Sequence, residues 1–458
     1  MDAHGGGARR IQWQQNQAGV APPRWEEWQM ETLRPGSTGA HVSMLQLGLQ
    51  RSGYYEGNLD GIYGAQTTEA VRRFQRAFGL SVDGVTGPQT WNAVLPFVRG
   101  YVVRRVQQGD TFWNLAQRYS TTVRAIATAN PGVDPQALRI GQSLTIPLRY
   151  AVVPTNLSYS YALLGEILDG LQARYPFLWR GNAGKSTMGK PLPLVRIGTG
   201  GVEVFYNAAF HSNEWITTPV LLKFLEEYAA AYARGGEIGG VSAETLYRRA
   251  TLYLMPMVNP DAVDLVTGAL QSGDAYSNAA RLAKNYPDIP FPAGWKANIV
   301  GIDPNVQFPA NWEKARDLKF AAGYRTPGPR EYPGTAPLTA AESRSVYDLT
   351  RNHDFALMLA YHTQGSIIYW KYLDYEPPRS REIGEKMSQA SGYPLELTPE
   401  GSSYAGYKDW YIQDYNRPGY TVEVGLGQNP LPISQFDEIY RANLGILTIG
   451  LTEASYIE

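Results

Sequence analysis

A strand that ends in two metal-binding side chains is the feature that most constrains the fold of this chain. Residues 202–208 alternate as a half-buried strand does, and residues 218–232 have the apolar spacing of a helix. His211 and Glu214 lie three residues apart in the short connection, where Ser212 is a typical helix-start residue. The pattern predicts an α/β fold in which a rigid strand-to-helix corner presents two ligands to one metal ion.

A catalytic zinc site requires a third protein ligand and one open position. The chain has only five His, and His362 is the best placed because it ends the apolar strand-like run 355–362. Open α/β sheets present functional groups at this end of their strands. A lone histidine is more often a core residue bonded to a neighbour, but the preceding His-x-x-Glu corner favours the ligand role. The predicted ligands of zinc are therefore His211, Glu214 and His362.

A carboxylate interrupts a second strand-like run, at Glu423 within residues 420–425. Burying an unpaired carboxylate is costly. Glu423 is therefore either half of a structural ion pair or a functional group. Taken with the ligand set, it is interpreted as a general base that takes a proton from the attacking water.

These residues, together with Asn259-Pro-Asp261 and Gly301-Ile-Asp-Pro-Asn305, resemble the zinc carboxypeptidase A class in order, spacing and strand context. The resemblance implies a mixed-sheet α/β catalytic domain, which we expect at residues 150–458. It also implies one zinc ion per chain and Glu423 as the catalytic carboxylate.

The substrate-facing positions depart from the family pattern. Lys296 stands where the family keeps an arginine that stabilises the anionic oxygen, and it supplies the charge without the two-pronged fork. Val306 follows Asn305, where the family usually has an arginine that clamps the substrate carboxylate. Asn213 replaces a second arginine. These changes count against a standard C-terminal exopeptidase.

A Gly-rich loop and its neighbour complete the expected substrate site. The family's substrate-capping tyrosine falls on Gly401, and two tyrosines of the same loop are the alternatives. Lys408 precedes an Asp-Trp pair at the position that lines the family's side-chain pocket, which implies an acidic substrate side chain. A solvent-facing lysine is the plain alternative. The expected substrate-binding residues are Asn305, Lys408, Asn213, Val306, Tyr404 and Tyr407.

Residues 31–98 form a separate helical unit with two Asp-Gly turns, at Asp60-Gly61 and Asp83-Gly84. The pattern resembles the three-helix peptidoglycan-binding domain of cell-wall hydrolases, an all-α fold. No cluster of acid, base or metal-binding residues occurs in this segment. The resemblance therefore implies binding and not chemistry.

Residues 101–148 resemble a LysM module, a βααβ unit that binds glycans containing N-acetylglucosamine. Asp110 and Thr111 also fit the role of helix caps. Short links near Gly100 and Arg149 predict limited freedom between the units. The residues of the two loops that would form the sugar groove are Gly109, Asp110, Thr111, Asn130, Pro131 and Leu138.

Composition fits this modular plan. The chain has 458 residues, with 41 basic and 42 acidic side chains and no basic run, so nucleic acid is not expected as a partner. It has no Cys, which excludes disulfides and thiol catalysis. No apolar run has the length of a membrane span, so membrane insertion is not expected. Residues 1–30 are polar and are expected to be disordered, without a secretory signal.

The resemblances together imply a zinc metallopeptidase that hydrolyses peptidoglycan stem peptides, at the bond between γ-D-glutamate and diaminopimelate. The expected partners are peptidoglycan glycan strands and stem peptides. The expected location is the cell wall or the spore, or the cytoplasm if the substrates are imported wall fragments. Two alternatives stay open: a wall-anchored zinc carboxypeptidase that acts on ordinary peptide C-termini, and a non-catalytic peptidoglycan-binding protein. The oligomeric state stays open as well.

Overall fold

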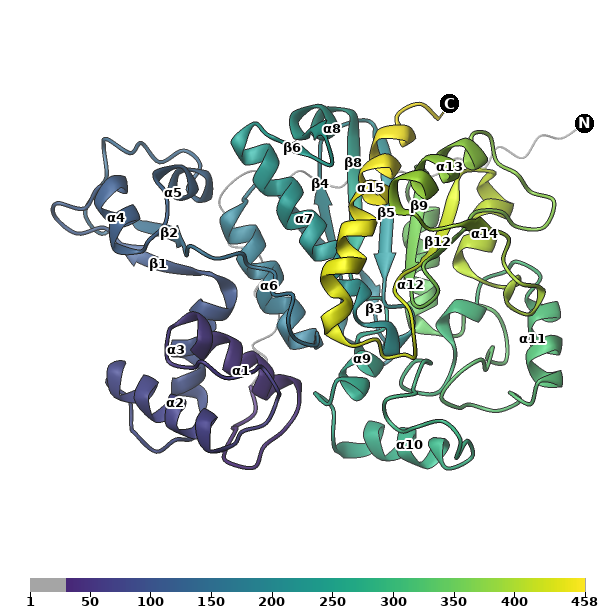
Figure 1. The fold of residues 1–458 in the computed structure, drawn as a ribbon, viewed down its shortest axis with the longest axis horizontal. Coiled ribbons are helices and arrows are strands. Elements are labelled where there is room, and N and C mark those ends of the chain that lie inside the picture. Colours follow the sequence, from purple (N-terminus) through teal and green to yellow (C-terminus); the bar gives the residue numbers. More distant parts are fainter. Residues whose placement is uncertain (1–29, 458) are drawn as a thin grey trace, which may run out of the picture.

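The computed structural model describes residues 30–457, so the expectation for residues 1–30 falls almost wholly outside the described residues. Figure 1 shows three consecutive units: a helical unit, a small two-stranded unit and a large domain built on a central sheet. This is the multidomain architecture that the sequence predicted. In the described part of the chain, no helix combines the length and apolar character needed to cross a membrane.

The first unit consists of helices α1 (Ala40–Arg51), α2 (Ala65–Ala77) and α3 (Pro88–Arg99). A buried glutamine holds each Asp-Gly turn. Gln46 donates to Asp60 Oδ1 at 2.8 Å and accepts from the Gly61 N–H at 3.0 Å. The same device recurs one helix later with Gln75, Asp83 and Gly84. Both glycines have a positive φ, 69° and 74°, which explains their place in the pattern.

The second unit has the βααβ order predicted for it, with β1 (Tyr101–Arg105), α4 (Phe112–Arg118), α5 (Val123–Ala129) and β2 (Ser143–Pro147). The two strands pair antiparallel. Leu115, Ile126 and Leu144 pack in its small apolar core. Helix α4 begins at Thr111, which forms a capping box with Asn114.

The third unit is built on an eight-stranded mixed sheet. Its strands are β3 (Trp179–Lys185), β4 (Pro191–Ile197), β5 (Val202–Ala208), β8 (Ala250–Met255), β9 (Phe355–His362), β10 (Ile367–Tyr369), β11 (Leu395–Glu396) and β12 (Gly419–Glu423). Their order across the sheet is β11-β10-β12-β9-β5-β8-β4-β3. Strands β12, β9, β5 and β8 run parallel to one another. Strand β10 is antiparallel to β12, β4 is antiparallel to β8, and β3 is antiparallel to β4. A separate hairpin joins β6 (Glu237–Ile238) to β7 (Val241–Ser242).

Alternation along the central strands gives the sheet two apolar faces. Val204 and Leu357 belong to the core shared with α6 (Tyr161–Arg174), α7 (Thr217–Arg234), α13 (Ser380–Ser391) and α15 (Phe436–Ala454). Phe205 and Met358 belong to the core shared with α11 (Trp312–Ala321), α12 (Ala341–Arg351) and α14 (Tyr407–Tyr415). Helices α8 (Ala243–Arg249), α9 (Pro260–Val266) and α10 (Gly273–Ala283) complete the domain (Figure 1).

The parallel strands bring four candidate residues to one edge of the sheet. Strands β9 and β12 pair so that His362 lies opposite Glu423, and β5 runs on the other side of β9. His211 and Glu214 follow β5 directly. The strand predicted at 202–208 is β5, and the helix predicted at 218–232 is α7, which begins one residue earlier.

The units pack against one another. Arg51 donates at 2.7 to 3.0 Å to three backbone carbonyl groups, those of Val98, Ala151 and Val152. Arg99 of α3 forms an ion pair with Glu166 of α6. Arg174 of α6 donates to the carbonyl of Gly100 at 3.1 Å, so the short link at Gly100 takes part in the contact.

Candidate metal centre and active site

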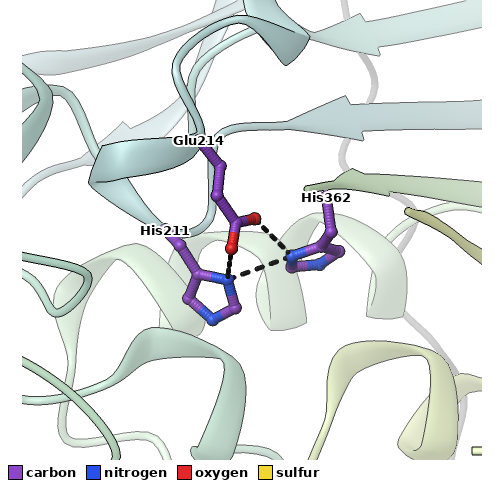
Figure 2. Close-up of side chains that lie close together, drawn as sticks. All are labelled: His211, Glu214 and His362. Atoms are coloured by element: carbon purple, nitrogen blue, oxygen red, sulfur yellow. Dashed lines mark hydrogen bonds and ion pairs between the residues drawn. The ribbon is translucent and has the colours of Figure 1, made fainter. Parts of the chain in front are cut away.

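Three side chains converge where β5 and β9 end. His211 follows β5, Glu214 ends the short turn η1 (Ser212–Glu214), and His362 is the last residue of β9. The Glu214 carboxylate lies 2.9 Å from Nδ1 of His211 and 3.0 Å from Nδ1 of His362 (Figure 2). These two nitrogens lie 3.1 Å apart. The structure therefore brings the three predicted ligands together, and all three are buried.

Hydrogen bonds fix the corner that carries the first two ligands. The Thr217 hydroxyl donates to the Glu214 carbonyl at 2.7 Å and accepts from the Ala209 N–H at 3.1 Å. The Ser212 hydroxyl donates to the Trp295 carbonyl at 2.7 Å. Ala209 has a φ of 53°, an uncommon conformation for a residue with a Cβ atom. The turn out of β5 is therefore held in one shape by its own side chains.

The chemistry of the donor set fits one zinc ion. Imidazole nitrogen and carboxylate oxygen are the ligand types of catalytic zinc sites, which use three protein ligands and keep one position open. One ligand atom from each of His211, Glu214 and His362 lies within 4.8 Å of the others. The Nδ1 atoms of His211 and His362 face each other and the Glu214 carboxylate. One cation between them would therefore give all three buried groups a partner.

Asp303 is a neighbour of this centre to which sequence analysis assigned no role. Its Oδ1 lies 3.3 Å from Nε2 of His211, the ring nitrogen that does not face Glu214. Burial by itself would raise the pKa of Asp303, but His211 and Lys296 hold that pKa well below its usual range. A carboxylate on the second nitrogen of a metal-binding histidine fixes its tautomer and orientation. In the sequence, the one sign that Asp303 belongs to the site is its position two residues before Asn305.

Glu423 is half-buried at the end of β12, beside His362. Burial and the charge of Glu214 raise the pKa of Glu423 to about 8, although Lys296 and His211 lower it. The half-buried carboxylate thus lies beside the ligands, where a general base could reach an attacking water.

Lys296 brings a positive charge to the same place. Burial by itself would lower its pKa, but Glu331, Asp303 and Glu214 raise it, so the ammonium group stays charged. Its Nζ lies 3.4 Å from Oε1 of Glu331. Its carbonyl accepts the N–H of Ser212 at 3.2 Å, which ties the Lys296 backbone to the ligand corner.

Two of the expected substrate-binding residues lie at the centre. Asn305 Nδ2 is 3.4 Å from Nε2 of His362, and its Oδ1 accepts the Tyr407 N–H at 3.1 Å. Asn213 lies between the ligands in η1, and its buried Oδ1 has no hydrogen-bond partner among the described residues. Val306, by contrast, packs in the apolar core with Phe308.

The other three expected residues are engaged elsewhere. The Lys408 ammonium group lies 2.6 Å from Asp409 Oδ1 and donates to the Lys371 carbonyl at 2.9 Å, with only 4% of the residue exposed. The fully buried Tyr407 bonds through its hydroxyl to Thr350 at 2.9 Å. The hydroxyl group of Tyr404 accepts a hydrogen bond from Lys314. In this structure none of the three side chains points a free polar group at the metal centre.

Three of the six expected groove residues of the second unit make structural hydrogen bonds or ion pairs. Thr111 caps α4, and Asp110 accepts the Gln107 N–H at 2.9 Å and pairs with Arg104. Asn130 donates to the Thr145 carbonyl at 2.7 Å. Gly109 and Pro131 are exposed, and Leu138 is partly buried. Sequence analysis did not single out Trp113 and Ile140, which are 67% and 73% exposed beside these loops.

Family models match three parts of the chain. The zinc carboxypeptidase model matches residues 164–445, the putative peptidoglycan binding domain matches residues 38–94, and the LysM domain matches residues 105–147. Each match falls on one of the three units of the structure.

Relatives and solved structures agree with these matches. The chain is 45% identical over 398 residues to gamma-D-glutamyl-L-diamino acid endopeptidase 1 of Lysinibacillus sphaericus, covering 76% of this chain and 98% of that protein. It is 38% identical over 105 residues to the spore cortex-lytic enzyme of Bacillus subtilis, covering 21% of this chain and 34% of that protein. Bovine thrombin-activatable fibrinolysis inhibitor shares the fold, with a TM-score of 0.51 and 18% identity over 66% of this chain and 98% of that chain. The chain therefore belongs to the zinc carboxypeptidase family and carries peptidoglycan-binding and LysM domains in front of its catalytic domain.

Proposed function

We propose that this enzyme hydrolyses the bond between γ-D-glutamate and diaminopimelate in peptidoglycan stem peptides. The observation that carries the proposal is a complete catalytic set, His211, Glu214, His362 and Glu423, combined with uncharged residues where a C-terminal exopeptidase keeps its arginine clamp. The activity named for the relative from Lysinibacillus sphaericus, a gamma-D-glutamyl-L-diamino acid endopeptidase, supports the same bond class.

Each residue of the site has one role in the proposed reaction. His211, Glu214 and His362 would hold the zinc ion, which when bound polarises a carbonyl group and makes water more acidic. Glu423 takes a proton from the attacking water and passes it to the leaving amine. Lys296 stabilises the negative charge that develops on the carbonyl oxygen. No covalent intermediate with the protein is needed.

The substrate would meet the uncharged side chains of Asn213 and Val306 where the family has arginines. Asn213 and Asn305 lie at the centre and are proposed to hydrogen bond the γ-linked D-residue. Val306, Tyr404, Tyr407 and Lys408 are proposed to shape the wall behind it, as packed residues. A γ-linked D-glutamate directs its chain differently from an ordinary α-linked residue, so a different set of contacts is expected.

The two N-terminal units are proposed to hold the enzyme on its polymer, with boundaries at residues 31–98 and 101–148. The LysM loops would bind glycan, and the exposed Trp113 and Ile140 beside them offer apolar surface to sugar rings. Association with the cell wall follows from these domains. The part-length similarity to spore cortex-lytic enzymes supports a spore wall as one site of action.

A peptide assay tests the proposal. Zinc-loaded protein is incubated with L-Ala-γ-D-Glu-diaminopimelate, beside a Glu423→Gln control, and the products are identified by mass spectrometry. We expect L-Ala-D-Glu and free diaminopimelate, formed by the wild-type protein and not by the control. An uncut stem peptide, together with cleavage of ordinary peptides that depends on a free C-terminal carboxylate, would overturn the substrate assignment.

A further inference from the structure

Glu331 joins two groups of the metal centre through its backbone and its side chain. Its N–H donates to Asp303 Oδ2 at 3.1 Å, while the other oxygen of Asp303 faces His211 at 3.3 Å. Its Oε1 lies 3.4 Å from Nζ of Lys296. Glu331 has a φ of 66°, an uncommon conformation for a residue with a side chain. Neither its sequence context nor a family motif singled it out.

The Glu331 carboxylate is held from more than one side. Oε2 lies 2.5 Å from Nζ of Lys319, and Nε of Arg330 lies 3.7 Å from Oε1. Lys319 also donates to the Gly401 carbonyl at 3.0 Å, so it is anchored to the loop at η3 (Glu400–Ser402). With one oxygen fixed by Lys319, the other oxygen has a defined place beside Lys296.

Lys296 needs such an anchor more than an arginine would. An ammonium group is a compact point charge on a flexible four-carbon stem, whereas a guanidinium group is planar and pre-organised. Stabilisation of a developing charge depends on a donor that is already in place. The contact of Lys296 to Glu331 is its one ion pair among the described residues, so this contact sets where the ammonium group lies.

We propose that Glu331 is a positioning residue that holds the Lys296 ammonium group where the anionic oxygen forms. The inference rests on the proposed function, in which Lys296 stabilises that oxygen. Glu331 touches neither substrate nor metal in this scheme, and its side chain acts only through Lys296, whereas its backbone N–H holds Asp303. Its carboxylate supplies a fixed hydrogen-bond acceptor and an opposite charge beside the partly buried ammonium group.

A double-mutant cycle tests this coupling. The variants are Glu331→Gln, Lys296→Met and the double variant, with Glu331→Asp as the conservative change. Glu382→Gln is the matched control. Glu382 also pairs with two cations, Arg379 and Lys386, but it lies on the surface and contacts no residue of the metal centre. The readouts are kcat and KM on L-Ala-γ-D-Glu-diaminopimelate and the Kd of its phosphinate analogue, in which a phosphinic group replaces the scissile amide. Zinc affinity is measured by chelator competition.

We expect Glu331→Gln to lower kcat about tenfold, less than the loss of about 10²-fold or more that follows removal of an oxyanion donor. KM and zinc affinity should stay within about twofold of wild type, and phosphinate affinity should fall with kcat. Adding Glu331→Gln to Lys296→Met should change kcat by less than about twofold. Glu331→Asp should recover part of the loss.

The variants distinguish a wrong inference about Glu331 from a wrong role of Lys296. If Lys296→Met lowers kcat and phosphinate affinity but Glu331→Gln does not, or if the two losses multiply in the double variant, the inference about Glu331 is overturned alone. If Lys296→Met changes neither quantity, the proposed role of Lys296 falls and the inference falls with it. A parallel loss of zinc affinity in Glu331→Gln would assign Glu331 to the support of Asp303 and would also overturn the inference.

Discussion

Asp303 lies outside the ligand set but contacts one of the ligands, His211. The Asp303 carboxylate faces Nε2 of His211. It also accepts hydrogen bonds from the N–H groups of Asn305 and Glu331, which hold the carboxylate in place. A second partner of this kind sets the tautomer of the histidine and strengthens it as a ligand.

Replacing Asp303 with asparagine should therefore weaken zinc binding by about 10- to 100-fold, because the amide cannot supply the negative charge. Competition with a chelator of known affinity measures the change. Asp288→Asn, at an exposed position, is the matched control and should bind zinc as the wild type does. Equal zinc affinity in both variants would show that Asp303 does not support His211.

Lys408 and Asp409 form a buried pair, with 4% and 2% of each residue exposed. Lys408→Met leaves the Asp409 carboxylate buried without its partner, and breaking a buried pair in this way costs about 3–5 kcal/mol of unfolding free energy. The double variant Lys408→Met/Asp409→Asn removes both charges and should recover much of that loss. Urea denaturation measures both values. Equal stability of wild type and Lys408→Met would indicate that the lysine is free to serve the substrate.

At the scale of elements, the contact between α3 and α6 joins the first unit to the catalytic domain. A Cβ atom on Gly170 of α6 would lie 2.1 Å from the Arg99 carbonyl oxygen, so only glycine allows the approach. Gly165 lies in the same helix, and a Cβ atom there would meet nothing within 4 Å.

These two glycines make a matched pair. Gly165→Ala should stabilise the protein by up to about 1 kcal/mol, because alanine favours a helix. Gly170→Ala should instead destabilise it by about 1–3 kcal/mol, since the helices must separate. Thermal unfolding followed by calorimetry compares them. If the two substitutions had the same effect, α3 would not be docked on α6 as the structure shows.

At the scale of the whole molecule, the metal centre lies where β5, β9 and the turn η1 meet. His211 and His362 are about 150 residues apart in the sequence, so a bound ion would link distant parts of the chain. A ligand that binds only the folded state stabilises it, by about 4 kcal/mol at 1,000 times its Kd. The zinc-loaded protein should therefore melt at a clearly higher temperature than the protein stripped with a chelator.

Differential scanning calorimetry with and without zinc measures this difference. The Glu214→Gln variant serves as the control, because the loss of one ligand should make its melting temperature much less sensitive to zinc. An unchanged melting temperature of the wild type would mean that zinc does not bind at this centre.

The metal ligands and the proposed base Glu423 could be predicted from the chain because each has a local signature. His211 and Glu214 share one turn, and His362 and Glu423 end strands that are recognisable from their own residues. Asp303 lies within the motif 301–305 but has no local pattern that indicates its role, and Glu331 stands in a loop without a pattern. Their roles depend on contacts with residues far away in the sequence, which no local pattern encodes.

The sequence by itself indicated the strand-to-helix corner and the candidate ligands, because periodicity, turn residues and ligand spacing are local properties. Its resemblances to known families implied the three units, the βααβ order and the mixed-sheet catalytic domain. The tertiary structure decided which polar groups remain available. It paired Lys408 with Asp409, directed the hydroxyl group of Tyr407 to Thr350, and placed Glu331 between Asp303 and Lys296. The physical reason is that a buried charge or hydroxyl group must find a partner, and packing across the whole chain determines which one it finds.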